Sequence, residues 1–303
     1  MIETPRLSIV LAVQFAQENL PLIMQRMNPV AHPDVEYLIC YTDDDPDTPT
    51  LLPTTDNTKI LKSEQNSLIP HLWRDGILAA KGQGVVTTTA HCLPDSTWVD
   101  TLLELKLDHA VGVGGTIDNS ADASARDWAI FFLRYLSYAP PQHPRVVPEI
   151  AADNALYRRT DLLRHRHLLQ TGFWEPSFHA RFLAEGLSLY MEPKLQVTMH
   201  NRYRAFEFFQ QRVCHGRAFA LARVSGSNVF KRIAFVVLSP LLPFIFFSKI
   251  LGRVSTYPTY RRHLLRAGPY LVLFLAGWGL GEARGYLASL WKQNDEPPRT
   301  DTF

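Results

Sequence analysis

Short apolar runs alternate with amphipathic stretches along the first third of the chain. Residues 8–13 are a β-branched apolar run, typical of a buried strand, and residues 18–27 place their apolar side chains on one face of a helix. The pattern continues with strands over 35–41, 84–89 and 110–114, a weak strand at 59–61, and helices over 69–80 and 97–107. Strands that alternate with helices predict βαβ units and a mostly parallel sheet with helices on both faces.

The alternation becomes less regular after residue 120. The pattern predicts, in order, an aromatic helix over 127–138, a strand edge over 151–159, a basic helix over 160–166, a helix over 173–185 and a short strand over 187–191. We expect a first domain over residues 1–200, a region of basic amphipathic and apolar helices over 201–292, and a polar tail over 293–303.

Ligands of open α/β sheets bind outside the carboxyl ends of the strands. Two loops here follow predicted strands and carry polar side chains. Residues 43–45 are three consecutive acids, and residues 88–95 include a histidine and an aspartate. We therefore expect the binding residues in these two loops.

Composition supports a folded core and argues against disulfides. Hydrophobic residues make up 46% of the chain and charged residues 20%. Cys40, Cys92 and Cys214 are isolated and form no CxxC pair, which fits a reducing compartment rather than a disulfide or zinc framework. Residues 1–6 lack the basic and apolar regions of a secretory signal.

The two most apolar stretches are residues 233–248 and 267–281. Both are shorter than the ~20 residues that span a bilayer, and the first holds Pro240 and Pro243, which break or kink a helix. The linker between them carries Lys249 and four arginines, which the positive-inside tendency keeps in the cytoplasm. We expect a re-entrant or interfacial pair on the cytoplasmic face of a membrane. Two buried helices of a soluble protein are the alternative.

Residues 202–232 mix basic side chains with aromatic ones at helical spacing. This pattern predicts an amphipathic helix on a membrane surface. A basic aromatic helix can also bind nucleic acid, but no known reading motif is present, so we expect no nucleic-acid partner.

Several motifs between Leu7 and His200 follow one another at a characteristic spacing. They are the stretch from Arg74 to Gly82, the sequence VVTTTAHCLPDSTW over 85–98, the sequence AADNALYRR over 151–159, and then Trp174-Glu175, Gly186, Pro193 and His200. In order and spacing they resemble family 2 glycosyltransferases. The resemblance implies a GT-A type nucleotide-sugar fold, and the residues around Trp278, Glu282 and Tyr286 resemble the C-terminus of membrane-associated relatives.

The main departure from that family lies in its metal loop. The family's Asp-x-Asp holds a divalent metal that neutralises charge on the leaving diphosphate. The matching positions here are Thr89, Ala90 and His91. Threonine is a poor metal ligand, and histidine suits Mn²⁺ or Zn²⁺ better than Mg²⁺. The resemblance thus implies Mn²⁺ or Mg²⁺ as a cofactor, the lost acids argue against it, and His91 is the remaining metal-ligand candidate.

Glu175 is the candidate catalytic base. An inverting transfer needs one carboxylate to take the proton of the acceptor hydroxyl. The alternative is a solvated acid in the first turn of a helix, where the helix dipole favours it. The spacing to Gly186 and Pro193 favours the catalytic role.

The resemblance assigns further residues to the donor and to its phosphates. The donor-binding candidates are Asp43, Asp44, Arg74, Asp75, His91 and Asn154, and those on the phosphate or acceptor side are His200, Arg202 and Arg204. Ordinary alternatives are turn chemistry for the acids and for Asn154, and a membrane-surface cluster for the basic group.

Together these patterns predict a membrane-associated, inverting, hexosyltransferase-like glycosyltransferase. It would move a sugar from a nucleotide-diphosphate sugar to a lipid-linked acceptor at the cytoplasmic face. The main rival is a catalytically silent relative that acts as a binding or scaffold protein, and the loss of the Asp-x-Asp acids is its best argument. A nucleotide-binding protein of another activity is a third option, since a fold does not fix a function.

Overall fold

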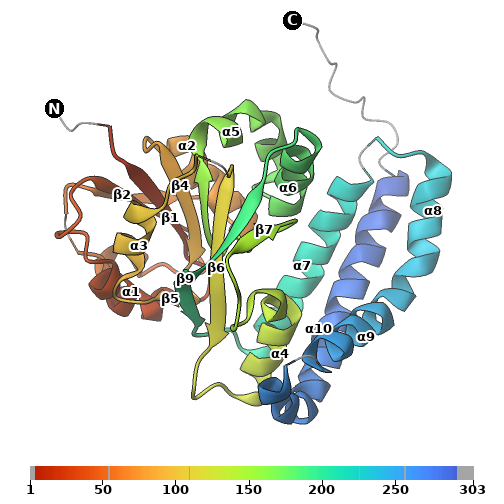
Figure 1. The fold of residues 1–303 in the computed structure, drawn as a ribbon. Helices are drawn as coiled ribbons and strands as arrows, with labels where there is room; N and C mark the ends of the chain where they lie inside the picture. Colours follow the sequence, from red (N-terminus) through yellow and green to blue (C-terminus); the bar gives the residue numbers. More distant parts are fainter. Residues whose placement is uncertain (1–3, 54, 109, 225, 256, 292–303) are drawn as a thin grey trace, which may run out of the picture. The chain divides into compact units, whose positions relative to one another are not determined.

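The computed structural model describes residues 4–53, 55–108, 110–224, 226–255 and 257–291 (Figure 1). The chain divides into two compact units. The first comprises the residues up to Ala123 together with Ser137–Arg202, and the second comprises Ser124–Leu136 and the chain from Tyr203 onward. The predicted polar tail over 293–303 lies outside the described residues.

Within the described residues, the first unit contains a nine-stranded sheet in the order β3-β2-β1-β4-β8-β6-β9-β5, with β7 paired to β9. Its strands are β1 (Leu7–Ala12), β2 (Val35–Tyr41), β3 (Thr58–Lys62), β4 (Gly84–Thr89), β5 (Cys92–Pro94), β6 (Gly112–Asn119), β7 (Arg145–Val147), β8 (Asn154–Arg158) and β9 (Leu189–Met199). Strands β3, β2, β1 and β4 are mutually parallel, and β6 is parallel to β9. The predicted α/β class and mostly parallel sheet are confirmed.

Helices cover both faces of this sheet. In the first unit they are α1 (Leu20–Met27), α2 (Ile69–Ala79), α3 (Trp98–Glu104), α5 (Arg159–Arg164) and α6 (Glu175–Ala184), with short 3-10 turns η1 (Gln17–Asn19), η2 (Thr48–Leu51) and η4 (Arg166–Thr171). Val10 and Leu38 belong to the core cluster that contains α2 and α6, whereas their neighbours Ile9 and Tyr37 are buried outside it. Side chains on both faces of these strands are fully buried, which explains why the strand sequences are continuous apolar runs.

Three details of the predicted sheet are wrong. Residues 90–95 are not only a loop, because β5 forms there and pairs with β9. The strand predicted as an edge over 151–159 is β8, which lies inside the sheet, antiparallel to both β4 and β6. The strand predicted to end before Pro193 continues to Met199, because a bulge in the β6–β9 pairing takes up the proline.

The second unit is helical. It contains α4 (Ala125–Arg134), α7 (Ala205–Arg223), α8 (Val229–Leu238), the 3-10 turn η5 (Ser239–Leu241), α9 (Leu242–Ser255) and α10 (Pro258–Trp291), and the turn η3 (Leu136–Tyr138) follows α4. The predicted aromatic helix is α4, which begins at the cap residue Ser124 and packs against α10. The break expected at the two prolines is η5, between α8 and α9.

Helix α7 packs along α10 through small residues. A Cβ atom on Gly281 would lie 2.3 Å from the Val213 carbonyl oxygen, and one on Gly285 would lie 2.6 Å from that of Arg217. The prediction that 202–232 forms one surface helix is therefore wrong. Helix α7 ends at Arg223, and it buries a polar and aromatic face that includes Phe208.

A buried polar network reinforces the helical unit. The Glu282 carboxylate accepts hydrogen bonds from Trp278 Nε1 at 2.5 Å and from the Tyr286 hydroxyl at 2.6 Å. All three residues lie on α10 at intervals of four, so they share one face. The Arg212 guanidinium of α7 lies over the Trp278 ring, 5.4 Å from its centroid.

Two helical segments, Val229–Ser255 and Pro258–Trp291, are long and apolar enough to cross a membrane by length and composition alone. They differ in burial within the unit. Only 11% of the apolar window of the first is buried, against 39% for the second. Large side chains on the first segment face solvent, including Phe230, Val237 and Phe244.

Candidate functional site

Two polar clusters lie where the parallel strands of the first unit end. The first, which we call the β2–β3 cluster, comprises Asp43, Lys62, Ser63, Arg74 and Asp75. The Lys62 ammonium contacts the Asp43 carboxylate at 2.6 Å, and the Ser63 hydroxyl donates to Asp75 at 2.5 Å. Arg74 Nε donates to the other Asp75 oxygen at 2.8 Å. The structure therefore brings three of the predicted donor-binding residues together.

The acids that follow β2 have different roles. Asp43 and Asp44 are exposed, and Asp44 accepts a hydrogen bond from the Thr42 hydroxyl. Asp45 is buried and accepts the backbone N–H groups of Phe15, Ala16 and Gln17. Burial raises the pKa of Asp45, and these three hydrogen bonds oppose the rise. Asp45 thus fixes the loop after β1, while its two neighbours are exposed, Asp43 in its ion pair with Lys62 and Asp44 in its hydrogen bond from Thr42.

The second group, which we call the β9 cluster, comprises Asn19, His200, Arg202 and Asp122. Arg202 Nε donates to Asn19 Oδ1 at 2.8 Å, and His200 Nδ1 lies 3.4 Å from the same oxygen. The Asn19 amide nitrogen donates to the carbonyls of Ala90 and His200. Asn19 therefore ties the ends of β4 and β9 together and orients two basic side chains.

Asp122 faces these basic groups from the loop after β6. The Ser120 hydroxyl donates to its carboxylate and lowers the pKa of Asp122, and the charges of His200 and Arg202 lower it further. Asp122 was not predicted from the sequence because the apolar run indicates a strand that ends at residue 114, whereas β6 runs on to Asn119. Recognition of the longer strand would have placed Asp122 at the carboxyl edge.

The positions that match the metal loop are packed inside the protein. Thr89 and Ala90 are fully buried, and His91 is 2% exposed. His91 Nε2 lies 2.9 Å from the Gln14 carbonyl oxygen, so it carries the proton and donates. Nδ1 then accepts the Arg202 backbone N–H at 3.4 Å. Both ring nitrogens are engaged, and these three residues do not fit a divalent metal.

Thr89 of this loop contacts a carboxylate, since its hydroxyl donates a hydrogen bond to Asp153 at 3.4 Å. Over the described ranges, no group of three or more His, Cys, Asp or Glu side chains could hold a metal ion. The sequence expectation of His91 as a metal ligand therefore finds no support in the geometry.

Glu175 begins α6 and is half-buried. It follows Phe173, whose backbone N–H donates to the Pro70 carbonyl in the first turn of α2. Burial is the main cause of the raised pKa of Tyr157, and the negative charge of Glu175 raises this pKa further. Glu175 thus lies on the face of the sheet that α2 and α6 cover, and it is not part of either cluster.

Asn154 holds the sheet together and is not open to a ligand. The side chain is fully buried. Its oxygen accepts Trp98 Nε1 at 2.9 Å, and its nitrogen donates to the carbonyls of Thr116 and Leu195. These three bonds connect α3, β6 and β9, so the geometry corrects the expectation that Asn154 contacts the donor.

Arg204 belongs to the second unit. Its backbone N–H and its guanidinium both contact Glu207 at the start of α7. The predicted trio His200, Arg202 and Arg204 is therefore divided, and the structure joins only the first two.

Comparison with known proteins gives a likeness of fold. No protein-family model and no curated protein matches the sequence. Among solved structures, the chain is similar to PcManGT, a mannosyltransferase from Pyrobaculum calidifontis in complex with GDP-Man and Mn²⁺. The match has a TM-score of 0.50 and 15% sequence identity, and it covers 96% of this chain and 88% of that one. At this identity the likeness shows a glycosyltransferase fold, not a reaction.

Proposed function

We propose that the protein is an inverting glycosyltransferase that takes its sugar from a nucleotide-diphosphate sugar. The observation that carries the proposal is the pair of polar clusters at the carboxyl edge of a sheet with a glycosyltransferase fold. This edge is where open α/β sheets bind ligands. Membership of family 2 remains a prediction, as does the hexosyl class of the sugar.

The β2–β3 cluster is suited to the nucleoside of the donor. Asp43 and Asp44 present exposed carboxylates that can accept hydrogen bonds from base N–H and ribose hydroxyl groups. Arg74 and Asp75 are only partly exposed and hold each other in place. They would border the same subsite.

The β9 cluster is suited to the diphosphate. Arg202 is partly exposed and oriented by Asn19, and a guanidinium binds phosphate oxygens through charge-assisted hydrogen bonds. Together with His200 it would neutralise the negative charge that develops on the leaving diphosphate. The mannosyltransferase of similar fold was solved with Mn²⁺. We propose that these cations do that work here, because His91 has no free lone pair for a metal.

Two carboxylates compete for the role of catalytic base. Glu175 is favoured by its motif, and Asp122 is favoured by its position beside His200 and Arg202. Either would take the proton of the acceptor hydroxyl while the acceptor attacks the sugar. We propose Glu175 as the base, since the hydrogen bond from Ser120 lowers the pKa of Asp122 and a carboxylate of lowered pKa is a weaker proton acceptor.

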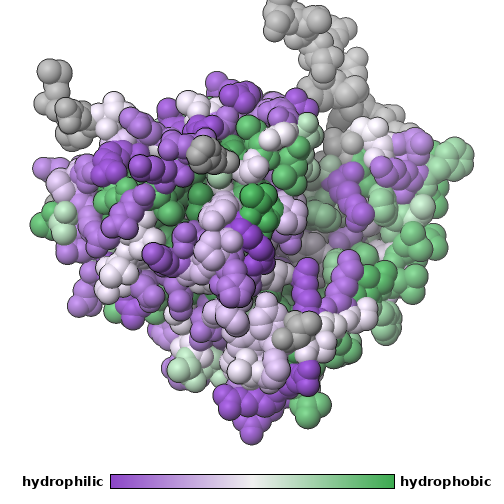
Figure 2. All heavy atoms as spheres, viewed as in Figure 1, coloured by the Kyte–Doolittle hydropathy of each residue, from purple (hydrophilic) through white to green (hydrophobic). Residues whose placement is uncertain are grey.

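We further propose that the second unit associates with a membrane. Figure 2 shows hydrophobic side chains gathered over α8 and α9. Phe230 is 79% exposed and Phe244 is 75% exposed, which disfavours two helices buried in a soluble core. An enzyme attached in this way meets lipid-linked acceptors at the interface, so we propose such an acceptor at the cytoplasmic face.

A catalytically silent binding protein is the second candidate. The observation in its favour is the buried metal loop, in which Thr89, Ala90 and His91 replace a catalytic motif. This candidate keeps the fold and the polar clusters and predicts donor binding without transfer.

Transfer assays separate the two candidates. Purified protein in lipid vesicles would be incubated with labelled UDP- and GDP-sugars and an extract of polyprenyl-phosphate and glycolipid acceptors. Label that moves into the lipid phase, with inversion at the anomeric carbon, supports the enzyme. If donors bind but no nucleoside diphosphate is released with any of the acceptors, the result supports the catalytically silent relative.

A further inference from the structure

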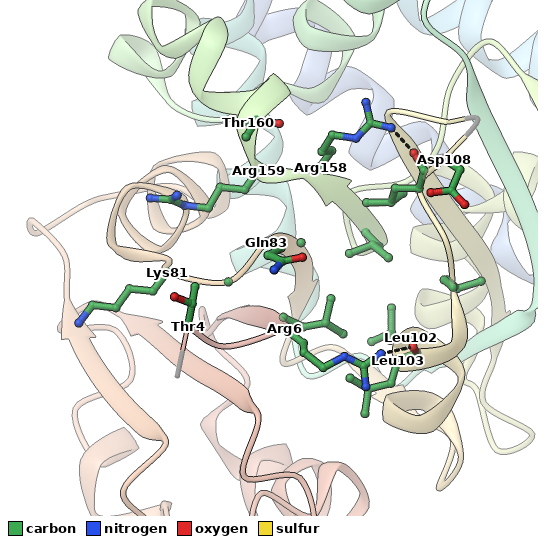
Figure 3. Close-up of a pocket in the computed structure, with 16 residues that line it drawn as sticks. Thr4, Arg6, Lys81, Gln83, Leu102, Leu103, Asp108, Arg158, Arg159 and Thr160 are labelled. Carbon is green, nitrogen blue, oxygen red and sulfur yellow. Dashed lines mark hydrogen bonds between the residues drawn. The ribbon is translucent and has the colours of Figure 1, made fainter. Parts of the chain in front are cut away.

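A pocket opens at the edge of the sheet opposite to the polar clusters (Figure 3). It lies at the amino ends of β1 and β4, beside Leu7 and Gly84, and at the carboxyl end of β8, beside Arg158. Its volume is about 820 Å³, within the range of small-molecule sites. All of its lining belongs to the first unit.

The lining combines positive charge with an apolar wall. Four basic residues line it, and Asp108 is the one acid among the lining residues that the structure describes. Six leucines supply the apolar part, namely Leu7, Leu102, Leu103, Leu105, Leu107 and Leu156. A site with this composition attracts a ligand that carries both a negative charge and an apolar body.

Two of the four cations are already committed to the protein. Arg6 donates to the Leu103 carbonyl at 2.8 Å and faces Asp34 at 3.6 Å. Arg158 pairs with Asp161 at 3.1 Å and donates to the carbonyls of Leu107 and Ala110. These contacts position the wall of the pocket, and they leave little capacity for a ligand.

The other two cations are available. Arg159 Nε is buried, yet it has no hydrogen-bond partner in the described part of the chain. Lys81 is exposed, and its ammonium makes no ion pair or hydrogen bond with any described residue. A buried donor without an acceptor is unfavourable, so a bound acceptor would stabilise Arg159.

Figure 3 shows how the two properties are distributed. Arg159 and Lys81 extend on one side of the pocket, and Leu102 and Leu103 lie on the other, with Gln83 between them. Arg6, Arg158 and Asp108 lie on the leucine side, where both arginines bond to backbone carbonyls of that wall. The two uncommitted cations are therefore separated from the leucines, as the head and the tail of an amphiphile require.

We propose that this pocket binds a single-chain anionic amphiphile, with a phosphate or carboxylate head between Lys81 and Arg159 and an alkyl or prenyl chain along the leucines. The site is distinct from the donor site, because it lies at the other edge of the sheet. Inorganic phosphate would contact only the two cations of the head site, and an uncharged alcohol would contact only the leucines.

Calorimetry on the full chain in a neutral maltoside detergent tests this site. The probe is hexyl phosphate, and the separate arms use inorganic phosphate and hexanol. We expect hexyl phosphate to bind at least tenfold more tightly than either inorganic phosphate or hexanol. If inorganic phosphate binds as tightly as hexyl phosphate, the pocket binds a free anion and the amphiphile proposal is overturned. If hexanol binds as tightly as hexyl phosphate, the two cations do not contribute and the proposal is overturned as well.

Charge variants locate the binding. The substitutions Lys81→Glu and Arg159→Gln should each weaken the binding of hexyl phosphate at least tenfold, because each removes a cation from the head site. Lys194→Glu, which changes an exposed lysine of β9 outside the pocket lining, should bind within twofold of wild type. Unchanged affinity in both pocket variants, or equal losses in all three, would refute the proposal. Nucleotide-sugar binding by Lys81→Glu should stay at the wild-type level.

Discussion

Asn19 and Asn154 hold the carboxyl edge of the sheet together through side-chain bonds to backbone carbonyls. Motif spacing placed Asn154 in this region but gave it a ligand role, and it did not single out Asn19. The reason is physical, since sequence spacing locates a residue near an edge but does not determine its burial. The exposed acids Asp43 and Asp44 were easier to predict, because consecutive acids before Pro46 cannot all be buried.

Substitution of the two candidate bases tests the assignment of proton transfer. Glu175→Gln should lower turnover by ~10²–10⁴ and leave donor affinity nearly unchanged, because the amide keeps the shape and loses only the proton acceptor. Asp122→Asn is the matched comparison and should lower turnover by less than tenfold. Steady-state kinetics with a saturating acceptor measure both. The reverse order of effects would transfer the role to Asp122.

The buried histidine of α6 predicts a pH dependence of stability. His179 Nε2 lies 3.0 Å from the Tyr157 hydroxyl, and burial lowers the pKa of His179 to about 4. The unfolded chain therefore binds a proton between pH 6.5 and 4 that the folded chain does not bind. Stability should be complete above pH 6.5 and should fall by about 3 kcal/mol on acidification to pH 4.

Thermal melting followed by tryptophan fluorescence at pH 7 and pH 5 measures this slope. His179→Gln removes the titrating group and should flatten the slope, although the variant is less stable at pH 7. A slope as steep as that of wild type would assign the acid sensitivity to other groups.

The elements themselves were well predicted where a single segment determines its own structure. Strands β2 and β4 have the predicted bounds, because each is an apolar run closed by turn residues. Strand β5 and the far ends of β6 and β9 were missed. Strand β5 depends on pairing with β9, more than 100 residues further along the chain. The far ends of β6 and β9 depend on pairing between segments about 80 residues apart and on a bulge at Gly114/Thr116, and local patterning contains none of this.

Two glycines of α10 test the close contact with α7. A Cβ on Gly281 would collide with the backbone of Val213, whereas a Cβ on Gly268 would meet no atom within 4 Å. Gly281→Ala should therefore destabilise the helical unit by about 1–3 kcal/mol through overpacking. Gly268→Ala should stabilise it slightly through helix propensity. Melting in detergent gives both values, and equal effects would mean that α7 and α10 do not pack as described.

The whole molecule consists of two units, and only part of that division was predictable. Composition separates the α/β part from the apolar helices, because the basic and apolar residues crowd the last hundred positions. The assignment of α4 to the helical unit was not predictable, since its sequence lies between two strands of the sheet. Only its packing against α10 reveals where it belongs.

Membrane association is tested better by surface substitutions than by truncation. Removal of the chain after Ser227 would uncover the face of α7 that packs on α10, which includes Phe208 and Gly216. Substitution of Phe230, Val237 and Phe244 by glutamine leaves that contact intact and removes exposed apolar area.

We expect the triple variant to shift from the floating vesicle fraction to the bottom fraction in flotation assays with anionic vesicles. The matched control replaces three exposed apolar residues of the first unit, Val30, Ile60 and Val146, and should stay with the membrane. Equal flotation of both variants and wild type would show that another surface makes the attachment.

The central claim is that the carboxyl-edge cations hold the donor diphosphate without a metal. Calorimetric titration of UDP- and GDP-sugars, in EDTA and in Mn²⁺, tests it on wild type, on Arg202→Gln and on the exposed control Arg166→Gln. We predict at least one donor whose Kd agrees within twofold in EDTA and Mn²⁺. For that donor, Arg202→Gln should weaken binding about tenfold or more and Arg166→Gln should not change it. No binding in EDTA, or full affinity in Arg202→Gln, would contradict the account.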